Sequence, residues 1–139
     1  MKMKYIFVIL LLIPLFSIAQ KMEHTDFIGK WSGEDNGEIG FITFAEDGFA
    51  FIEIGGQLMG GEQFTIKGEK ASLSYQINTE VEPITVDFVL KNLVTNEERT
   101  LYCIAKYLEP NSMQFAINFV DLRPEDFTDR NSIVLTKVE

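Results

Sequence analysis

Two short apolar runs flank an Asp-Gly step in residues 37–54, which read Gly37-Glu-Ile-Gly-Phe-Ile-Thr-Phe-Ala-Glu-Asp-Gly-Phe-Ala-Phe-Ile-Glu-Ile54. Within each run, apolar residues tend to recur at every second position, which is the period of a half-buried β-strand. An Asp-Gly step between two such runs is a strong hairpin signal, because both residue types tolerate the positive φ angles of a tight turn. This stretch therefore predicts two antiparallel strands.

The same alternation continues along the chain on both sides of this hairpin. The apolar segments are short, and Gly, Asn, Asp or Pro residues separate each from the next. No segment shows a helical period over three turns. Together with a first strand around Trp31, the expected strands are residues 37–44, 49–54, 63–66, 71–77, 84–90, 99–107, 112–119 and 132–138.

The order of these segments predicts an all-β fold. Nearly every connection is as short as a hairpin turn, which favours an antiparallel up-and-down meander. A meander of eight or nine strands removes its exposed edges most easily by closing into a β-barrel, and a β-sandwich is the alternative. Residues 121–131 are the irregular exception, with room for one helical turn at Pro124, and we expect Arg123 to pair there with Asp87 or Glu125.

The first 19 residues have the order of zones typical of a cleavable secretory signal peptide. Two lysines precede an apolar run over residues 5–16, and Ser17-Ile18-Ala19 fits a signal peptidase. The run is shorter than the roughly 20 residues of a membrane-spanning helix. We therefore expect cleavage before Gln20, a periplasmic or secreted product with no membrane span, and one barrel domain over residues 20–139.

The expected mature chain is strongly acidic. Removal of residues 1–19 leaves 120 residues, with 10 of the 12 basic side chains and all 21 acidic ones, a formal net charge of −11. Nucleic acids and anionic membranes both require clustered Lys and Arg, so neither partner is expected. Such acidity favours a soluble monomer. Cys103 is the only cysteine, so an intramolecular disulfide is ruled out, and its β-rich surroundings predict a buried thiol.

The sequence contains no motif for metal binding, cofactor binding or catalysis. Its acidic segments, residues 34–38 and 125–129, lack the ligand spacing of a calcium loop. A histidine-dependent triad would have to use His24, which lies before the first expected strand. We expect no metal, no cofactor and no enzymatic activity. An enzyme would require polar groups to converge inside the barrel, and the candidates for that are Glu53, Asp87 and Tyr102.

Three segments carry a resemblance to a known family. Asp26-Phe-Ile-Gly29-Lys-Trp31 resembles the Gly-x-Trp signature that opens the first strand of lipocalins and the wider calycin group. Pro83-Ile-Thr-Val-Asp87 and Arg123-Pro-Glu-Asp-Phe127 are similar to small exported bacterial lipocalin-like domains of uncharacterised function. The resemblance implies that the indole of Trp31 plugs the closed end of a barrel, and that Lys137, in the last strand, crosses the indole. The family more often has Arg there, and it often has a disulfide.

The resemblance implies an exported protein that binds a small apolar ligand in the barrel or at its mouth. Eight-stranded barrels are just wide enough to hold one small ligand or to be filled by side chains. A filled barrel would instead act through its loops, as an interaction or inhibitor module for an unknown protein partner. The candidate ligand-binding residues are Phe41, Phe51, Leu58, Met59, Tyr75, Phe88 and Phe115, and the fold signature is Gly29, Trp31 and Lys137.

Residues 55–61, Gly-Gly-Gln-Leu-Met-Gly-Gly, have two interpretations. They could form a mobile flap that displays Leu58 and Met59 over the barrel mouth. Alternatively, their glycines serve a hairpin turn and a β-bulge. Both interpretations stay open at the level of the sequence.

Overall fold

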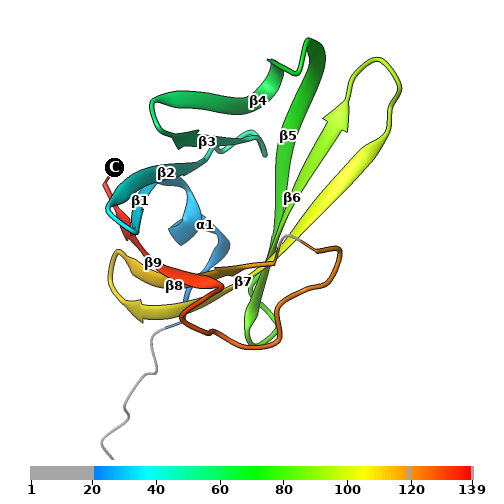
Figure 1. Ribbon diagram of the computed structural model, residues 1–139. Coiled ribbons are helices and arrows are strands. Elements are labelled where there is room, and N and C mark those ends of the chain that lie inside the picture. Colours follow the sequence, from blue (N-terminus) through cyan, green and yellow to red (C-terminus); the bar gives the residue numbers. More distant parts are fainter. Residues whose placement is uncertain (1–20, 119, 139) are drawn as a thin grey trace, which may run out of the picture.

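A computed structural model describes residues 21–118 and 120–138, so the expected signal peptide, residues 1–19, lies outside the described residues. The described residues form nine strands in one closed antiparallel barrel, in sequence order, with β1 pairing with β9 (Figure 1). This confirms the predicted up-and-down barrel over the sandwich. The strands are β1 (Gly29–Asp35), β2 (Glu38–Phe44), β3 (Ala50–Ile54), β4 (Gln57–Ile66), β5 (Glu69–Asn78), β6 (Ile84–Asn92), β7 (Glu98–Glu109), β8 (Ser112–Ile117) and β9 (Ser132–Lys137).

The predicted hairpin joins β2 to β3, but its turn uses the Asp-Gly step differently from our expectation. Only Gly48 has a positive φ, of 92°, whereas Asp47 does not. The Gly48 N–H donates to the Ala45 carbonyl at 3.2 Å, and Asp47 Oδ1 accepts from the Phe49 N–H at 3.1 Å. Asp47 therefore contributes through its side chain, while Gly48 alone takes the left-handed backbone conformation.

The glycines of residues 55–61 belong to a hairpin and a bulged strand. Residues 55 and 56 form the turn between β3 and β4, and a β-bulge follows Gly61 in β4. Gly60 pairs with Phe51, and a Cβ atom at Gly60 would overlap the neighbouring β3 backbone. A Cβ atom at Gly61 would lie 2.8 Å from the Phe51 ring. Close approach of β3 and β4 thus accounts for this glycine pair.

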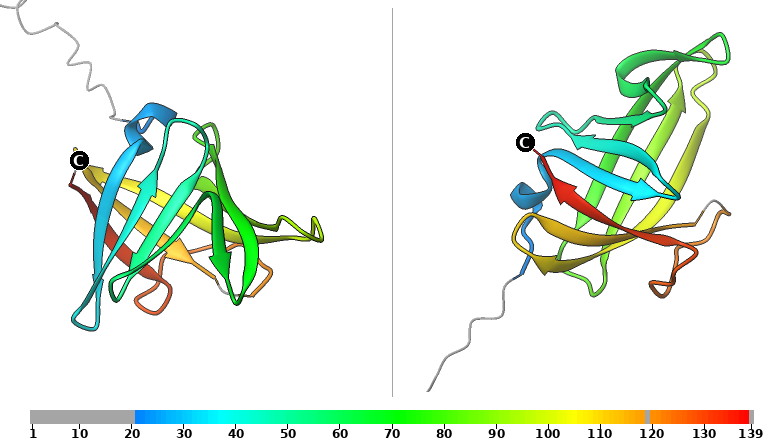
Figure 2. Two further views of the ribbon diagram at one scale, coloured as in Figure 1. Left: turned by 90° about the horizontal axis from the view of Figure 1, so that it is seen from above. Right: turned by 60° about the vertical axis from the view of Figure 1, so that its left-hand side comes forward.

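A short helix, α1 (His24–Phe27), lies at one end of the barrel, opposite the β1–β2 turn (Figure 2). Its Phe27 side chain is fully buried, and the Trp31 indole N–H donates to the Phe27 carbonyl at 2.8 Å. The sequence did not predict α1, because four residues are too few to show a helical period. No helix within the described residues is long and apolar enough to cross a bilayer.

A row of aromatic rings extends from α1 into the middle of the barrel. The Phe27 ring packs edge-on against Phe44 at a centroid distance of 5.8 Å, and Phe44 stacks on Phe88 at the same distance. Phe115 continues the row, 6.2 Å from Phe88. Such pairs add to the free energy of apolar burial. The row therefore connects α1 to the core in the middle of the barrel.

The long connection between β8 and β9 is held against the outer face of the barrel. Arg123 Nη1 lies 2.7 Å from Asp87 Oδ1 and also donates to the Cys103 carbonyl at 2.9 Å. The guanidinium carbon lies 5.0 Å from the centroid of the Tyr102 ring. These contacts confirm the expected ion pair and identify Asp87 as its partner. Residues 120–131 contain bends and turns in place of the helical turn at Pro124.

Barrel closure depends on a short seam between β1 and β9. Within the described chain, these strands pair at Trp31–Lys137 and Ser32–Thr136. The Val138 N–H also donates to the Lys30 carbonyl at 2.8 Å. Pairing stops beyond Ser32, on the side of the β1–β2 turn. The barrel wall is therefore least complete at the end opposite α1.

Candidate ligand-binding cavity

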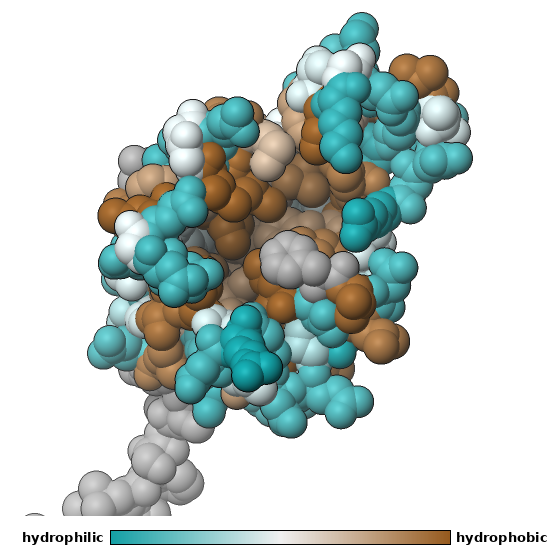
Figure 3. Space-filling view, viewed as in Figure 1, coloured by the Kyte–Doolittle hydropathy of each residue, from teal (hydrophilic) through white to brown (hydrophobic). Residues whose placement is uncertain are grey.

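A cavity of about 600 Å³ opens in the half of the barrel away from α1. Figure 3 shows the hollow, with a mostly hydrophobic wall inside a rim of hydrophilic and hydrophobic side chains. The deepest lining side chains are all buried, and they are those of Ile42, Phe88, Phe115 and Leu135. Half-buried aliphatic side chains continue the wall towards solvent, and they are those of Ile52, Leu101, Ile117 and Ile133.

Strand register explains why these residues meet in one cavity. Ile42 lies opposite Ile52, Phe88 lies opposite Leu101, and Phe115 lies opposite Ile133. Paired residues on neighbouring strands share a face of the sheet, so each pair continues the same inner surface. Gly33 and Gly40 also border the cavity and contribute no side chain. The Ile133 and Leu135 side chains pack closely over Gly33, where an added Cβ atom would lie 2.8 Å from each of them.

The charged groups at the rim of the cavity are mostly acidic. The β1–β2 hairpin contributes the exposed carboxylates of Asp35 and Glu38. The β8–β9 connection contributes Asp129 and Arg130, both exposed. Within the described residues, none of these four forms an ion pair. The mouth thus presents three carboxylates and one guanidinium to any bound molecule.

Internal hydrogen bonds order the part of the β8–β9 connection that borders the mouth. Asn131 Oδ1 accepts from the Thr128 N–H at 2.8 Å, and its Nδ2 donates to the Asp126 carbonyl at 2.9 Å. The Ser132 hydroxyl donates to the Thr128 carbonyl at 2.5 Å. These contacts hold Asp129 and Arg130 in a compact turn. The rim charges therefore stand at defined positions beside the cavity.

Of the seven ligand-binding candidates named from the sequence, Phe88 and Phe115 lie at the cavity floor. Phe41 also borders the cavity, but it alternates with the inward-facing Ile42, and the Lys30 ammonium lies 4.4 Å from its ring centroid. The structure therefore brings two of the predicted rings together inside the barrel and places a third at its edge.

Tyr75 belongs to the core beside α1. Its hydroxyl donates to the Ala45 carbonyl at 2.5 Å, and its ring packs edge-on against Phe44 at 5.0 Å. Burial raises the pKa of the Tyr75 hydroxyl, and the negative charges of Asp47 and Glu46 act in the same direction. Tyr75 thus supports the closed end and does not line the cavity.

Phe51, Leu58 and Met59 also lie outside the cavity lining. The Phe51 ring packs beside Gly61, and the Leu58 side chain is 65% exposed. Met59 pairs with Ile52, which does line the cavity, but lies farther round the barrel. Residues 55–61 therefore contribute no wall to this site.

Sequence reasoning missed the aliphatic majority of the cavity wall. It selected five aromatic residues together with Leu58 and Met59, whereas Ile42, Leu101 and Leu135 also line the cavity. The signal that identifies them is the alternation of inward-facing and outward-facing positions along each strand. Ile42 faces inwards next to the outward-facing Phe41, and Leu101 lies two positions before Cys103 on the inner face. Following the inward phase of every strand would have found most of the wall.

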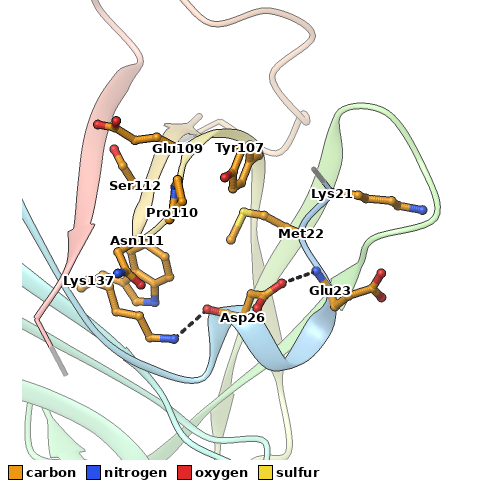
Figure 4. A pocket seen from close by; sticks show the side chains of 11 residues that line it. Lys21, Met22, Glu23, Asp26, Tyr107, Glu109, Pro110, Asn111, Ser112 and Lys137 are labelled. Carbon is orange, nitrogen blue, oxygen red and sulfur yellow. Dashed lines mark hydrogen bonds between the residues drawn. The ribbon is translucent and has the colours of Figure 1, made fainter. Parts of the chain in front are cut away.

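The fold-signature residues lie together at the closed end. The Lys137 ammonium lies 5.5 Å from the centroid of the Trp31 ring and donates to the Asp26 carbonyl at 2.9 Å (Figure 4). Gly29, with a φ of 130°, carries the chain from α1 into β1. This arrangement places a cation beside a buried indole, which is the placement that the resemblance implies.

A second hollow of about 480 Å³ lies beside this closed end (Figure 4). Its lining includes the exposed and charged residues Lys21, Glu23, Asp26 and Glu109. An apolar molecule bound here would cover charged side chains and remove them from water, and that desolvation cost offsets the gain from apolar burial. The cavity at the opposite end is therefore the better candidate for a binding site.

The polar groups that could take part in catalysis do not converge in the cavity. Asp87 and Tyr102 pair across β6 and β7 on the outer face, and Glu53 is outward-facing on β3. Burial raises the pKa of the Cys103 thiol well above its ordinary value, Asp87 adds to this effect, and Arg123 opposes it. Across residues 21–118 and 120–138, no three His, Cys, Asp or Glu side chains form a metal-binding group.

What this site can do follows from its own geometry. A concave apolar surface with a few polar groups at its edge can enclose the apolar part of a small molecule and leave a polar end at the solvent.

No family model matches the sequence, and comparisons with curated proteins and with solved structures find no match either.

Proposed function

We propose that this protein is an exported, lipocalin-like carrier that binds a small apolar molecule inside its barrel. The observation that carries the proposal is the cavity of about 600 Å³ with its floor of buried Phe and aliphatic side chains. That volume lies within the range of roughly 300–1,000 Å³ typical of small-molecule sites. Removal of apolar ligand surface from water supplies the driving force, at about 25 cal/mol per Å².

Two further features support the lipocalin-like assignment and the export. The Gly29-Lys-Trp31 motif stands at the start of β1, and Lys137 of the last strand lies over the indole. The N-terminal 19 residues have the zone order of a secretory signal. A carrier outside the cytoplasm has to remain folded without a disulfide, and a closed barrel provides that through its own core.

A matched pair of substitutions on β9 tests the proposal. Ile133 lines the cavity, whereas its neighbour Val134 is 52% exposed on the outer face. Titration with the neutral apolar probe N-phenyl-1-naphthylamine should give saturable, one-to-one binding. I133W should weaken that binding about tenfold or more by filling the cavity, which amounts to about 1.4 kcal/mol. V134W should change the affinity less than about twofold, within the range of surface substitutions.

Two results would contradict the proposal. One is the absence of saturable probe binding to the folded wild-type protein. The other is equal affinity of the wild-type protein and I133W, with circular dichroism confirming that both are folded. Native mass spectrometry of protein purified from its own host then addresses the natural ligand, because a co-purifying small molecule should be lost from I133W and retained by V134W.

A second candidate function is a protein-interaction module that acts through its outer surface. Exposed apolar side chains lie near the first residues of β2 and β4, where Ile39 is 57% exposed and Leu58 is 65% exposed. Under this function, L58D should abolish binding to a protein partner from the host, while I133W should leave that binding unchanged. The cavity supports the carrier function first, because an interaction module does not require an unfilled interior.

A further inference from the structure

The shape of the cavity dictates which end of a ligand meets which part of the protein. Its floor consists of Ile42, Phe88, Phe115 and Leu135, which offer no polar side-chain group. Burying a charged or hydrogen-bonding group against such a floor carries a large desolvation cost. An elongated amphiphile therefore binds with its apolar chain inwards and its polar head at the rim.

The rim has an unequal balance of charge. Among the described residues that line the cavity, Asp35, Glu38 and Asp129 are acidic and Arg130 is the only cation. The Glu38 carboxylate reaches towards the β3–β4 turn, where its Oε1 would lie 3.5 Å from a Cβ atom at Gly55. The rim thus carries a formal charge of −2, with acidic groups contributed by the β1–β2 hairpin and the β8–β9 connection.

The net charge of the whole protein is also negative, like that of the rim. The whole sequence has 21 acidic and 12 basic residues, and the two lysines of the expected signal peptide are among the basic ones. A cleft between low-dielectric walls focuses the field of its charges, so the rim acts on a ligand head more strongly than dispersed surface charges do. An anionic head at this position meets repulsion, whereas a cationic head meets attraction while it keeps most of its hydration.

From this geometry we infer that the cavity selects amphiphiles with a cationic head over those of the same chain length with an anionic head. This inference rests on the proposed function, because it concerns the ligand class of the same cavity. The expected ligand is therefore an alkylammonium type of amphiphile, and free fatty acids should bind less tightly. Arg130 moderates the preference but does not reverse it, because the rim carries three carboxylates against this one guanidinium.

Three twelve-carbon compounds test the inference by displacement of N-phenyl-1-naphthylamine at pH 7.4. They share a twelve-carbon chain and differ in the head: dodecyltrimethylammonium, dodecanol and dodecanoate, the two ions used below their critical micelle concentrations and dodecanol below its solubility limit. At about 20 mM salt, the cation should bind about tenfold more tightly than the anion, with dodecanol between them. At about 500 mM salt the ratio should fall towards about twofold, because the screening length shortens to a few ångströms.

Two triple variants locate the source of the preference. D35N/E38Q/D129N removes the rim carboxylates and should abolish discrimination between the cation and the anion. D121N/E125Q/D126N makes the same change of net charge at exposed positions that do not line the cavity, and should preserve the discrimination. All six side chains are exposed, so both variants should fold as the wild-type protein does.

The outcomes separate this inference from the proposed function. Dodecanoate binding as tightly as the cation overturns the inference alone, as does equal loss of discrimination in both triple variants. Failure of the probe and of all three compounds to bind the folded protein overturns the inference and the carrier function together. Discrimination that is lost in the rim variant and kept in the control variant supports both.

Discussion

Lys137 connects two parts of the closed end with a single side chain. Its ammonium lies over the Trp31 ring and also donates to the Asp26 carbonyl in the last turn of α1. A cation near the end of a helix stabilises the unpaired carbonyl groups there, and a cation over an indole gains from the ring quadrupole. The side chain therefore couples the last strand to the first strand and to the helix.

K137M should lower the free energy of unfolding by about 1–2 kcal/mol, because it keeps the apolar stem and removes the cation and its hydrogen bond. Urea unfolding followed by Trp31 fluorescence measures the change. K106M is the matched control, since Lys106 is exposed on β7, and it should cost at most about 0.5 kcal/mol. Equal costs in both variants would show that the contacts of Lys137 do not stabilise the fold.

Cys103 makes folding depend on pH in the alkaline range. Its ordinary pKa is 9.0, and in the folded protein burial raises that pKa, with a smaller contribution from Asp87. Stability is therefore unaffected by this thiol below pH 9 and falls as pH rises further, because only the unfolded chain readily loses the proton. The decrease is at most about 1.4 kcal/mol per pH unit.

Urea unfolding at pH 9 and at pH 10 measures this slope. C103A should be less stable than the wild-type protein at pH 7, because it removes a buried group, yet it should lose less stability between pH 9 and pH 10. Tyr75, whose pKa is raised from 10.0, adds its own effect at higher pH in both proteins. An unchanged slope in C103A would contradict this assignment.

At the level of elements, hairpin order was predictable and the cavity was not. Period-two alternation and turn residues located the strands, and β2, β3 and β6 begin within one residue of the predicted positions. α1 was too short to show a period, and β4 begins at Gln57 because the Gly-rich segment joins the ladder. Among the candidate site residues, Phe88 and Phe115 could be named for their inward phase. The void above them depends on the summed volume of side chains from many strands, which no local pattern reveals.

The clamp between Asp87 and Arg123 holds the β8–β9 connection, which supplies Asp129 and Arg130 to the rim. D87N should leave global stability within about 1 kcal/mol of the wild-type value, since both partners are partly exposed. It should increase amide hydrogen exchange in residues 120–131 and accelerate ligand dissociation. Mass-spectrometric hydrogen exchange and stopped-flow probe release measure the two effects. D121N, an exposed change in the same connection, should alter neither, and unaltered exchange in D87N would count against the clamp.

At the scale of the whole molecule, ligand binding and folding stability should be linked. A ligand that binds only the folded barrel stabilises it by about 2.7 kcal/mol when present at 100 times its Kd. For a domain of this size, that corresponds to an increase in Tm of about 10 °C. Differential scanning fluorimetry with dodecyltrimethylammonium measures the increase. I133W should lose the ligand-induced increase, whereas V134W should keep it. A fully retained increase in I133W would place the ligand outside the cavity.

The short seam between β1 and β9 also has a consequence for how the chain folds. Each hairpin joins residues that are close in sequence, whereas the contact of Lys137 with Asp26 spans 111 positions. Loop-closure entropy makes such a distant contact slow to form, so the seam should form late, after the hairpins are in place. Trp31 is the only tryptophan and lies at that seam. Its fluorescence should therefore report the rate of the final folding step, while far-ultraviolet circular dichroism follows the earlier formation of the sheet.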